Sequence, residues 1–191
     1  IVHMGDGKKA LKPIKEILEE TEIPRRIFRP THVNRREELL VEAFEFAKEG
    51  GIIDLTCGIY EDLSPTRVIL RAEEEGVPLG NITVSSDGYG SWSRYDEFGK
   101  LLKIGVSSVT SLYKELKTMV LEQDMDLEKA LKYFTSNVSK SLNLYPKKGT
   151  IVEDADADLL IVDQDMNLDY VIARGRVMLR DKEIIVKGTY E

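Results

Sequence analysis

The amino-acid sequence predicts an α/β fold in which parallel strands alternate with helices, as a sheet or a barrel. Two observations support this prediction. Between Val2 and Ser85, short apolar runs suited to strands alternate with amphipathic stretches suited to helices. Three apolar runs end at or just before a residue that can bind a metal ion or move a proton, namely His3, His32 and Asp87. Catalytic groups of barrel enzymes stand at such carboxyl ends of strands.

The spacing of these three residues agrees with the alternation. His3 and His32 are 29 residues apart, and His32 and Asp87 are 55 apart. A strand, its helix and their loops take roughly 30 residues, so the two intervals correspond to one and two repeats. The three side chains therefore belong to three strand ends of one sheet or barrel.

Local signals predict each element up to Ser85. Helical spacing of apolar residues predicts helices over residues 10–20, 36–48 and 66–75. Gly50-Gly51 ends the second helix, as glycine after a C-cap does, and Pro65 stands at the start of the third. Apolar runs predict strands over residues 26–32, 52–56 and 81–85.

The pattern changes after Asp87. Residues 88–105 are rich in Gly, Ser and aromatic residues and lack a clear period, which predicts a long irregular loop. Helices are predicted over residues 107–122 and 127–142. The remainder is β-rich and predicts a small separate sheet, with strands at 157–163, 169–173, 176–179 and 184–186 and turns at 174–175 and 181–182.

Composition limits the classes of protein. The 191 residues are 42% hydrophobic and 32% charged, as is usual for a soluble globular protein. A net charge of -7 argues against a nucleic-acid partner, and no apolar run approaches the roughly 18 residues of a membrane span. The single Cys57 excludes an internal disulfide and fits a reducing compartment. We expect a cytoplasmic protein without nucleic-acid or membrane partners.

The beginning of the sequence indicates a fragment or one product of a cleaved longer chain. Ile1-Val2-His3 resembles the end of a buried strand whose earlier residues are absent. The alternative is that His3-Met4 is a cloning remnant. The following Gly5-Asp6-Gly7 suits a strand-to-helix loop and favours the first interpretation.

Four segments carry a resemblance to a known family: His3-Met4-Gly5-Asp6, Thr31-His32-Val33-Asn34-Arg35, Ser85-Ser86-Asp87-Gly88 with Gly90-Ser91, and the stretch from Lys148 to Val162. They resemble the metal-dependent amidohydrolase superfamily, and most closely its β-aspartyl (isoaspartyl) dipeptidases, over essentially the whole chain. The resemblance implies the carboxyl-terminal half of a (β/α)8 TIM-like barrel in residues 1–148 and strands of a small β-sandwich in residues 149–191.

The resemblance also implies site residues and partners. His3 and His32 would ligate the second metal of a two-zinc centre, and Asp87 would be the proton shuttle. Arg35 and Ser91 would bind a substrate carboxylate. A His-x-His pair and a lysine carbamate would come from the missing amino-terminal half of the same enzyme. The family also implies a homo-oligomer.

These residues have structural interpretations as well. His3 and His32 could be core histidines, and Asp87 a turn residue. Arg35 could be a solvated residue in the first turn of the next helix, as Arg36 would be, and Asn34 could be the N-cap of that helix. Other residues have two interpretations each: Tyr89, Trp92 and Tyr95 could close over substrate or pack in a lid or subunit contact, and Cys57 could line the pocket or, more in keeping with its type, fill the core.

The acidic residues 153–158 lack the glycine and spacing of an EF-hand loop, so we expect a turn there.

The resulting functional hypothesis is a metallo-dipeptidase that hydrolyses β-aspartyl dipeptides. A hydroxide activated by two metals would attack the isopeptide carbonyl, and Asp87 would handle the protons. Alternatives are another amidohydrolase, acting on a cyclic amide or as a deacetylase, and a metal-free scaffold with the same fold. The retained His3, His32 and Asp87 make the scaffold the weaker alternative.

Overall fold

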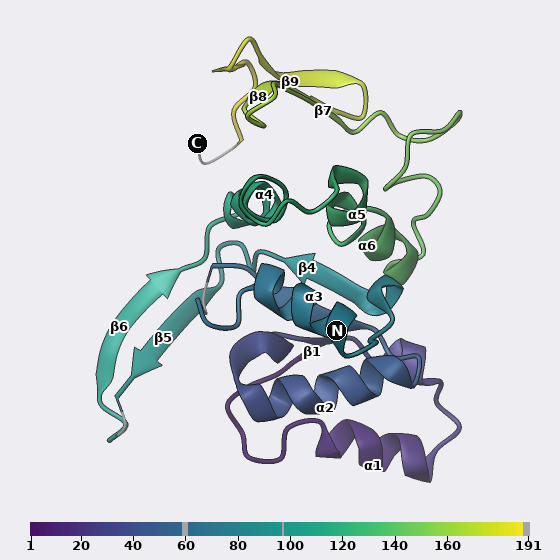
Figure 1. The fold of residues 1–191 in the computed structure, drawn as a ribbon, viewed down its shortest axis with the longest axis vertical. Coiled ribbons are helices and arrows are strands. Elements are labelled where there is room, and N and C mark those ends of the chain that lie inside the picture. The colour runs from purple at the N-terminus through teal and green to yellow at the C-terminus, as the bar shows by residue number, and fades with distance from the viewer. Residues whose placement is uncertain (59–60, 97, 189–191) are drawn as a thin grey trace. The chain divides into compact units, whose positions relative to one another are not determined.

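The structure, a computed structural model, describes residues 1–58, 61–96 and 98–188 and has the predicted α/β content (Figure 1). The chain divides into two compact units, Ile1–Asn137 and Val138–Glu191. None of the helices in these described ranges combines the length and the apolar character needed to cross a membrane.

The first unit contains four short parallel strands separated by helices. β1 (Val2–His3) pairs with β2 (Pro30–Thr31), and β3 (Ile53–Thr56) pairs with β4 (Ile82–Ser85). β2 and β3 lie side by side, although no backbone ladder joins them in the described residues. The connecting helices are α1 (Lys12–Glu20), α2 (Glu37–Lys48) and α3 (Pro65–Glu74), with single 3-10 turns η1 (Arg25–Ile27), η2 (Val33–Arg35) and η3 (Leu79–Asn81). The described residues form no closed barrel.

The helices α2 and α3 form where the sequence predicts them. Six apolar side chains of α2 are buried, and Glu37 and Glu38 lie in its first turn, where acidic residues offset the helix dipole. The α3 helix begins with Pro65, and the Ser64 hydroxyl accepts a hydrogen bond from the Arg67 N–H.

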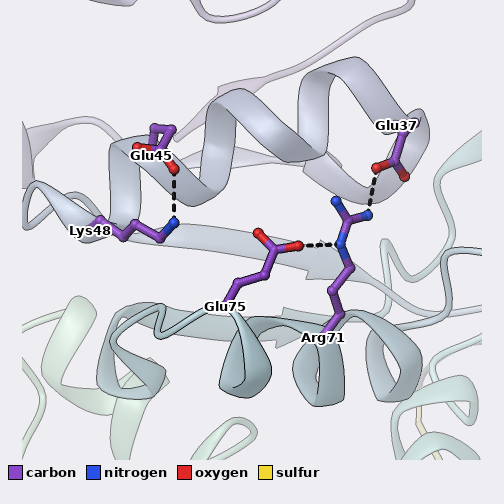
Figure 2. Close-up of polar contacts among 5 residues, drawn as sticks. All are labelled: Glu37, Glu45, Lys48, Arg71 and Glu75. Carbon is purple, nitrogen blue, oxygen red and sulfur yellow. Dashed lines mark hydrogen bonds and ion pairs between the residues drawn. The ribbon is translucent and has the colours of Figure 1, made fainter.

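An exposed ion-pair network connects α2 with α3. Figure 2 shows the Arg71 guanidinium between two carboxylates, 2.5 Å from Glu37 and 2.6 Å from Glu75. The Lys48 ammonium lies 2.9 Å from Glu45 on α2. The network lies on the surface, whereas Ile53 and Leu55 of β3 are fully buried in the apolar core.

The outer edge of β4 is already paired. The Val84 N–H donates to the carbonyl of Tyr133, and the Asn137 side chain donates to the carbonyl of Ile82. Both partners belong to the segment that holds α5 (Leu127–Lys132) and α6 (Ser136–Ser141). The polar groups along this edge of β4 are therefore satisfied by helical residues rather than by another strand.

The prediction of a long irregular loop at residues 88–105 is wrong. The chain forms an antiparallel hairpin of β5 (Ser91–Tyr95) and β6 (Leu101–Val106), which projects from the rest of the first unit (Figure 1). Gly105 permits this pairing, because a Cβ there would lie 2.2 Å from the Trp92 ring. Mixed Ser, Trp and Arg residues hid the strand period, and the glycine that accommodates the ring looked like a loop residue.

The helices after the hairpin are shorter than predicted. α4 (Ser111–Lys117) continues into a π-helical turn, η4 (Thr118–Glu122). The predicted helix over residues 127–142 is divided into α5 and α6. Between these two helices, the Thr135 hydroxyl donates to the carbonyl of Leu131, a local bond that competes with a regular helix.

The second unit contains the small separate sheet that the sequence predicts. Its strands are antiparallel in the order β10-β9-β8-β7, with bounds β7 (Leu159–Val162), β8 (Leu168–Ala173), β9 (Arg176–Arg180) and β10 (Glu183–Ile184). Both predicted turns have two central residues with positive φ, 48° and 77° at 174–175 and 49° and 68° at 181–182. These are type I′ turns, whose twist matches that of the strands.

The acidic segment 153–158 begins with a turn, as expected, and its carboxylates have protein partners. The Lys148 ammonium lies 2.9 Å from Asp156 and 2.5 Å from Asp158. Asp158 also accepts a hydrogen bond from the Arg174 N–H at 2.7 Å. Hydrogen bonds from Lys148 and from the Arg174 backbone hold the pKa of Asp158 below its ordinary value.

Candidate functional site

The two histidines meet where β1 and β2 end. His3 is the last residue of β1, and His32 follows β2 in the left-handed region, with φ 63°. Their Nδ1 and Nε2 atoms, respectively, are 3.0 Å apart. The parallel register that pairs His3 with Thr31 produces this contact between residues distant in the sequence. His3 is exposed and His32 is buried, so the pair lies at the edge of the interior.

The spacing and chemistry of the pair fit a zinc ion. Two imidazole nitrogens bound to one tetrahedral zinc at about 2.0–2.1 Å would be about 3.3 Å apart. The 3.0 Å between the two nitrogens of His3 and His32 is the length of a hydrogen bond between the rings, and it is close to that value. Two ligands are too few for a stable site, and within the described ranges no three His, Cys, Asp or Glu side chains gather to hold a metal ion.

Thr56 holds the second ring nitrogen of His32. The His32 Nδ1 atom lies 2.7 Å from the Thr56 hydroxyl at the end of β3. This hydrogen bond leaves Nε2 as the nitrogen that faces His3. A ligating histidine usually has such a partner, which fixes its tautomer and ring orientation. This role of Thr56 was not predicted from the sequence, because 24 residues separate Thr56 from His32.

Asn34 holds Thr56 in turn. Its side-chain oxygen accepts from the Thr56 N–H at 2.8 Å, and its side-chain nitrogen donates to the carbonyls of Thr56 and Leu63. Both Asn34 and Thr56 are fully buried. The interpretation of Asn34 as the cap of the following helix is wrong, because Arg36 occupies the N-cap position of α2.

The surroundings of His32 favour its neutral form. Burial lowers the pKa of His32 below its ordinary value of 6.5, and the charges of Arg35 and His3 lower it further. The negative charge of Asp87 acts in the opposite direction. A neutral imidazole is the form that binds a metal.

Asp87 lies in a tight turn near this pair. It has φ 50°, and the N–H of Gly90 donates to its carbonyl at 2.8 Å. The negative charge of Asp87 raises the pKa of His32 and that of Asp54. A Cβ at position 90 would lie 2.6 Å from an Asp87 carboxylate oxygen, so a larger residue there would displace that side chain. Asp87 is therefore a turn residue whose charge acts on the buried histidine.

Arg35 and its neighbour hold η2 against the loop after β1. The Arg35 guanidinium lies 3.3 Å from the Asp6 carboxylate, and Arg36 donates to the carbonyl of Gly7 at 2.5 Å. The expectation that Arg36 is simply solvated is therefore wrong. The Arg35 Nε atom is buried and has no acceptor among the described residues, so the guanidinium retains a donor.

The remaining candidate residues have other surroundings. Ser91 is exposed at the start of β5, where it pairs with Val106, and no hydrogen bond within the described ranges joins it to His3, His32 or Arg35. Trp92 packs inside the hairpin, with the Lys103 ammonium 5.4 Å from its ring centroid. Cys57 is buried, which raises the pKa of its thiol, as suits a core residue.

Comparisons with known proteins agree on one family. The sequence profile of the Amidohydrolase family matches residues 13–178. A β-aspartyl dipeptidase from the thermophilic, keratin-degrading Fervidobacterium islandicum AW-1, solved in complex with a β-Asp-Leu dipeptide, is 34% identical, with a TM-score of 0.88 over 98% of this chain and 49% of that one. Another structure of a β-aspartyl dipeptidase from that source gives 32% identity and a TM-score of 0.81, over 98% and 47%.

A curated relative is more distant. A D-hydantoinase from Geobacillus stearothermophilus is 27% identical over an alignment 128 residues long, which covers 54% of this chain and 26% of that protein. The present chain thus spans about half the length of the dipeptidase chains and a quarter of the hydantoinase.

Proposed function

The chain belongs to the amidohydrolase family, and from this premise we propose that it forms part of a metal-dependent dipeptidase that hydrolyses β-aspartyl dipeptides. The observation that carries the proposal is the His3–His32 pair, with facing nitrogens 3.0 Å apart at two strand ends. The 34% identity to a β-aspartyl dipeptidase over 98% of this chain supports the substrate class.

We further propose that the four parallel strands of the first unit are the last four of a (β/α)8 barrel. Their order along the chain, with a helix after each of the first three, supports this assignment. The strands of an amino-terminal half would join at β1, and closure of the barrel at the outer edge of β4 would have to accommodate the helical residues that form hydrogen bonds there. Residues 149–191 would contribute strands to the small β-sandwich, and the assembled enzyme would be a cytoplasmic homo-oligomer with two zinc ions per site.

Each proposed site residue has a distinct task. His3 Nδ1 and His32 Nε2 would hold zinc, which when bound supplies a hydroxide nucleophile near neutral pH and polarises the scissile carbonyl. Asp87 would accept a proton from the attacking water and deliver it to the leaving amine. Arg35 would pair with a carboxylate of the dipeptide, to which the Ser91 hydroxyl would add a hydrogen bond.

The test uses the native protein, with any polypeptide that accompanies this chain, and β-Asp-Leu as substrate. We expect hydrolysis that a chelator abolishes and zinc restores. Asp87→Asn should lower kcat by about 10²–10⁴-fold, the usual contribution of a general acid–base, and should leave bound zinc unchanged. Zinc-loaded protein that leaves β-Asp-Leu intact would contradict the proposal, and absence of zinc binding would favour the metal-free scaffold.

The similarity to a D-hydantoinase favours a second candidate, hydrolysis of a cyclic amide. The same preparation assayed with a hydantoin distinguishes the two, because the proposed carboxylate partners, Arg35 and Ser91, are not needed for that ring. Faster hydrolysis of the hydantoin than of β-Asp-Leu would replace the dipeptidase assignment with the second candidate.

A further inference from the structure

The strand β3 lies in the middle of the site, and no residue at its end is a proposed ligand. β3 lies between β2, which precedes His32, and β4, which precedes Asp87. Ile53 and Leu55 of β3 face the apolar core and are fully buried. Asp54 lies between them and therefore projects from the opposite face of the strand, towards the polar side of the site.

The Asp54 carboxylate accepts three hydroxyl hydrogen bonds from both neighbouring strands. Thr31 of β2 and Ser85 of β4 each donate to Oδ2 at 2.6 Å. Thr83 of β4 donates to Oδ1 at 2.7 Å. Thr31 directly precedes His32, and Ser85 lies two residues before Asp87. One carboxylate is thus bonded to the strand ends that position both proposed reactive residues.

The link to β2 has no backbone substitute. β3 and β4 are joined by a parallel ladder that pairs Asp54 directly with Thr83. No ladder joins β2 to β3 in the described residues. The Thr83 hydroxyl therefore adds a hydrogen bond between β3 and β4, which the backbone ladder already joins. The Thr31 hydroxyl joins β2 to β3, and in the described residues only side chains make that connection.

Asp54 is ill suited to be a ligand or a proton shuttle itself. A carboxylate offers about four lone-pair positions for hydrogen bonds. In Asp54, hydrogen bonds from three hydroxyl groups already occupy three of these positions. Burial and the nearby charge of Asp87 raise its pKa, while the three hydroxyl bonds lower it. Such a carboxyl group is occupied by the protein rather than open to a reactant.

We propose that Asp54 is a positioning residue, which holds the ends of β2 and β4 against β3 and thereby fixes His32 and Asp87 relative to each other. The connection of the strand ends rests on the hydrogen bonds alone. Its consequence for zinc and catalysis rests on the proposed function.

Three variants of the native protein test the proposal by competition with a chelating dye for zinc. Asp54→Asn replaces one acceptor oxygen with an amide that donates hydrogen bonds, so the three hydroxyl groups can no longer all donate to this side chain. Thr31→Val removes only the hydroxyl that reaches from β2. We expect both to weaken zinc binding about 10–100-fold, as loss of a group supporting a metal ligand usually does. Thr83→Val, the matched control on β4, should stay within about threefold of wild type.

Two results would overturn the proposal: wild-type zinc affinity in Thr31→Val, or an equal loss in Thr83→Val. Should Asp54→Asn fail to fold, Thr31→Val retains the carboxylate and still decides. The NMR signals of the His32 ring in metal-free protein separate this proposal from the proposed function. A shift in Thr31→Val but not in Thr83→Val would support the positioning role even in a protein that binds no zinc, and unchanged signals in both would contradict it.

Discussion

The two sides of β3 are joined to their neighbours in different ways. Towards β4, four successive residue pairs form a parallel backbone ladder, from Ile53 with Ile82 to Thr56 with Ser85. Towards β2, the described residues form no ladder, and side chains make the connection: Thr31 to Asp54, His32 to Thr56 and Asn34 to Thr56.

The difference shows where the site depends on particular residues. A backbone ladder forms with almost any sequence of suitable strands, whereas a hydroxyl or an amide bond needs one specific side chain. The buried histidine stands on the β2 side, where those specific side chains are. Substitutions at the β2–β3 junction should therefore affect the site more than equally buried substitutions on the β4 side.

The largest effect is expected for Asn34→Ala. The variant removes three hydrogen bonds of a fully buried side chain, to the N–H and carbonyl of Thr56 and to the carbonyl of Leu63. Each buried group left without a partner costs roughly 1–3 kcal/mol, so we expect a loss of about 3 kcal/mol or more in the free energy of unfolding. Denaturant titration of the metal-free protein measures it.

Asn81→Ala, which removes a half-buried amide with one hydrogen bond, is the reference for that measurement. The Asn81 side chain donates one hydrogen bond, at 2.9 Å, to the carbonyl of Ala47 at the end of α2. We expect a loss of about 1 kcal/mol. Equal losses in the two variants would show that the β2–β3 junction has no special dependence on its side chains.

A smaller and more local effect is expected for Thr56→Val. The valine keeps the shape of threonine but leaves the Nδ1 atom of His32 without its partner at 2.7 Å. Zinc affinity should fall by about 10–100-fold, with little change in the outer strands. Thr56→Ser, which retains the hydroxyl, should restore most of the affinity in the same chelator competition. Failure of serine to do so would mean that packing, not the hydrogen bond, is what matters there.

Asn34 and Thr56 also show the limit of what the sequence could predict. Helical periodicity, capping residues and two-residue turns are local signals, and they located α1 to α3, β3, β4 and the small sheet to within a few residues. The contact between His3 and His32 followed from one repeat of strand and helix, a regular feature of the chain. Asn34 and Thr56 are different, because their partners lie 22 to 29 residues away and no periodic pattern connects them.

The prediction of a loop after Asp87 was wrong for a related reason. Its strands pair across a turn in which the Asp96 side chain accepts from the N–H groups of Phe98 and Lys100. The glycine that looked like a loop residue, Gly105, instead makes room for the Trp92 ring in the paired strand. The role of Gly105 depends on its contact with Trp92 across the hairpin, and the residues next to Gly105 in the sequence do not reveal that contact.

The smallest effect is expected from the titration of His32. Its pKa lies below the ordinary value of 6.5, first because of burial. Below about pH 6.5 the unfolded chain therefore binds a proton that the folded protein does not, so the stability of the metal-free protein falls as pH decreases. The slope is at most about 1.4 kcal/mol per pH unit for one group.

The matching variant His32→Gln isolates this contribution. Asp54 acts with the opposite sign, because its raised pKa gives stability that is lost as pH rises. Only the difference between wild type and His32→Gln, measured by denaturant titration from pH 7.5 to pH 5, is assigned to the imidazole. We expect the wild type to lose more stability on acidification than the variant does. Parallel curves would mean that His32 is not held neutral by its surroundings on the β2 side of β3.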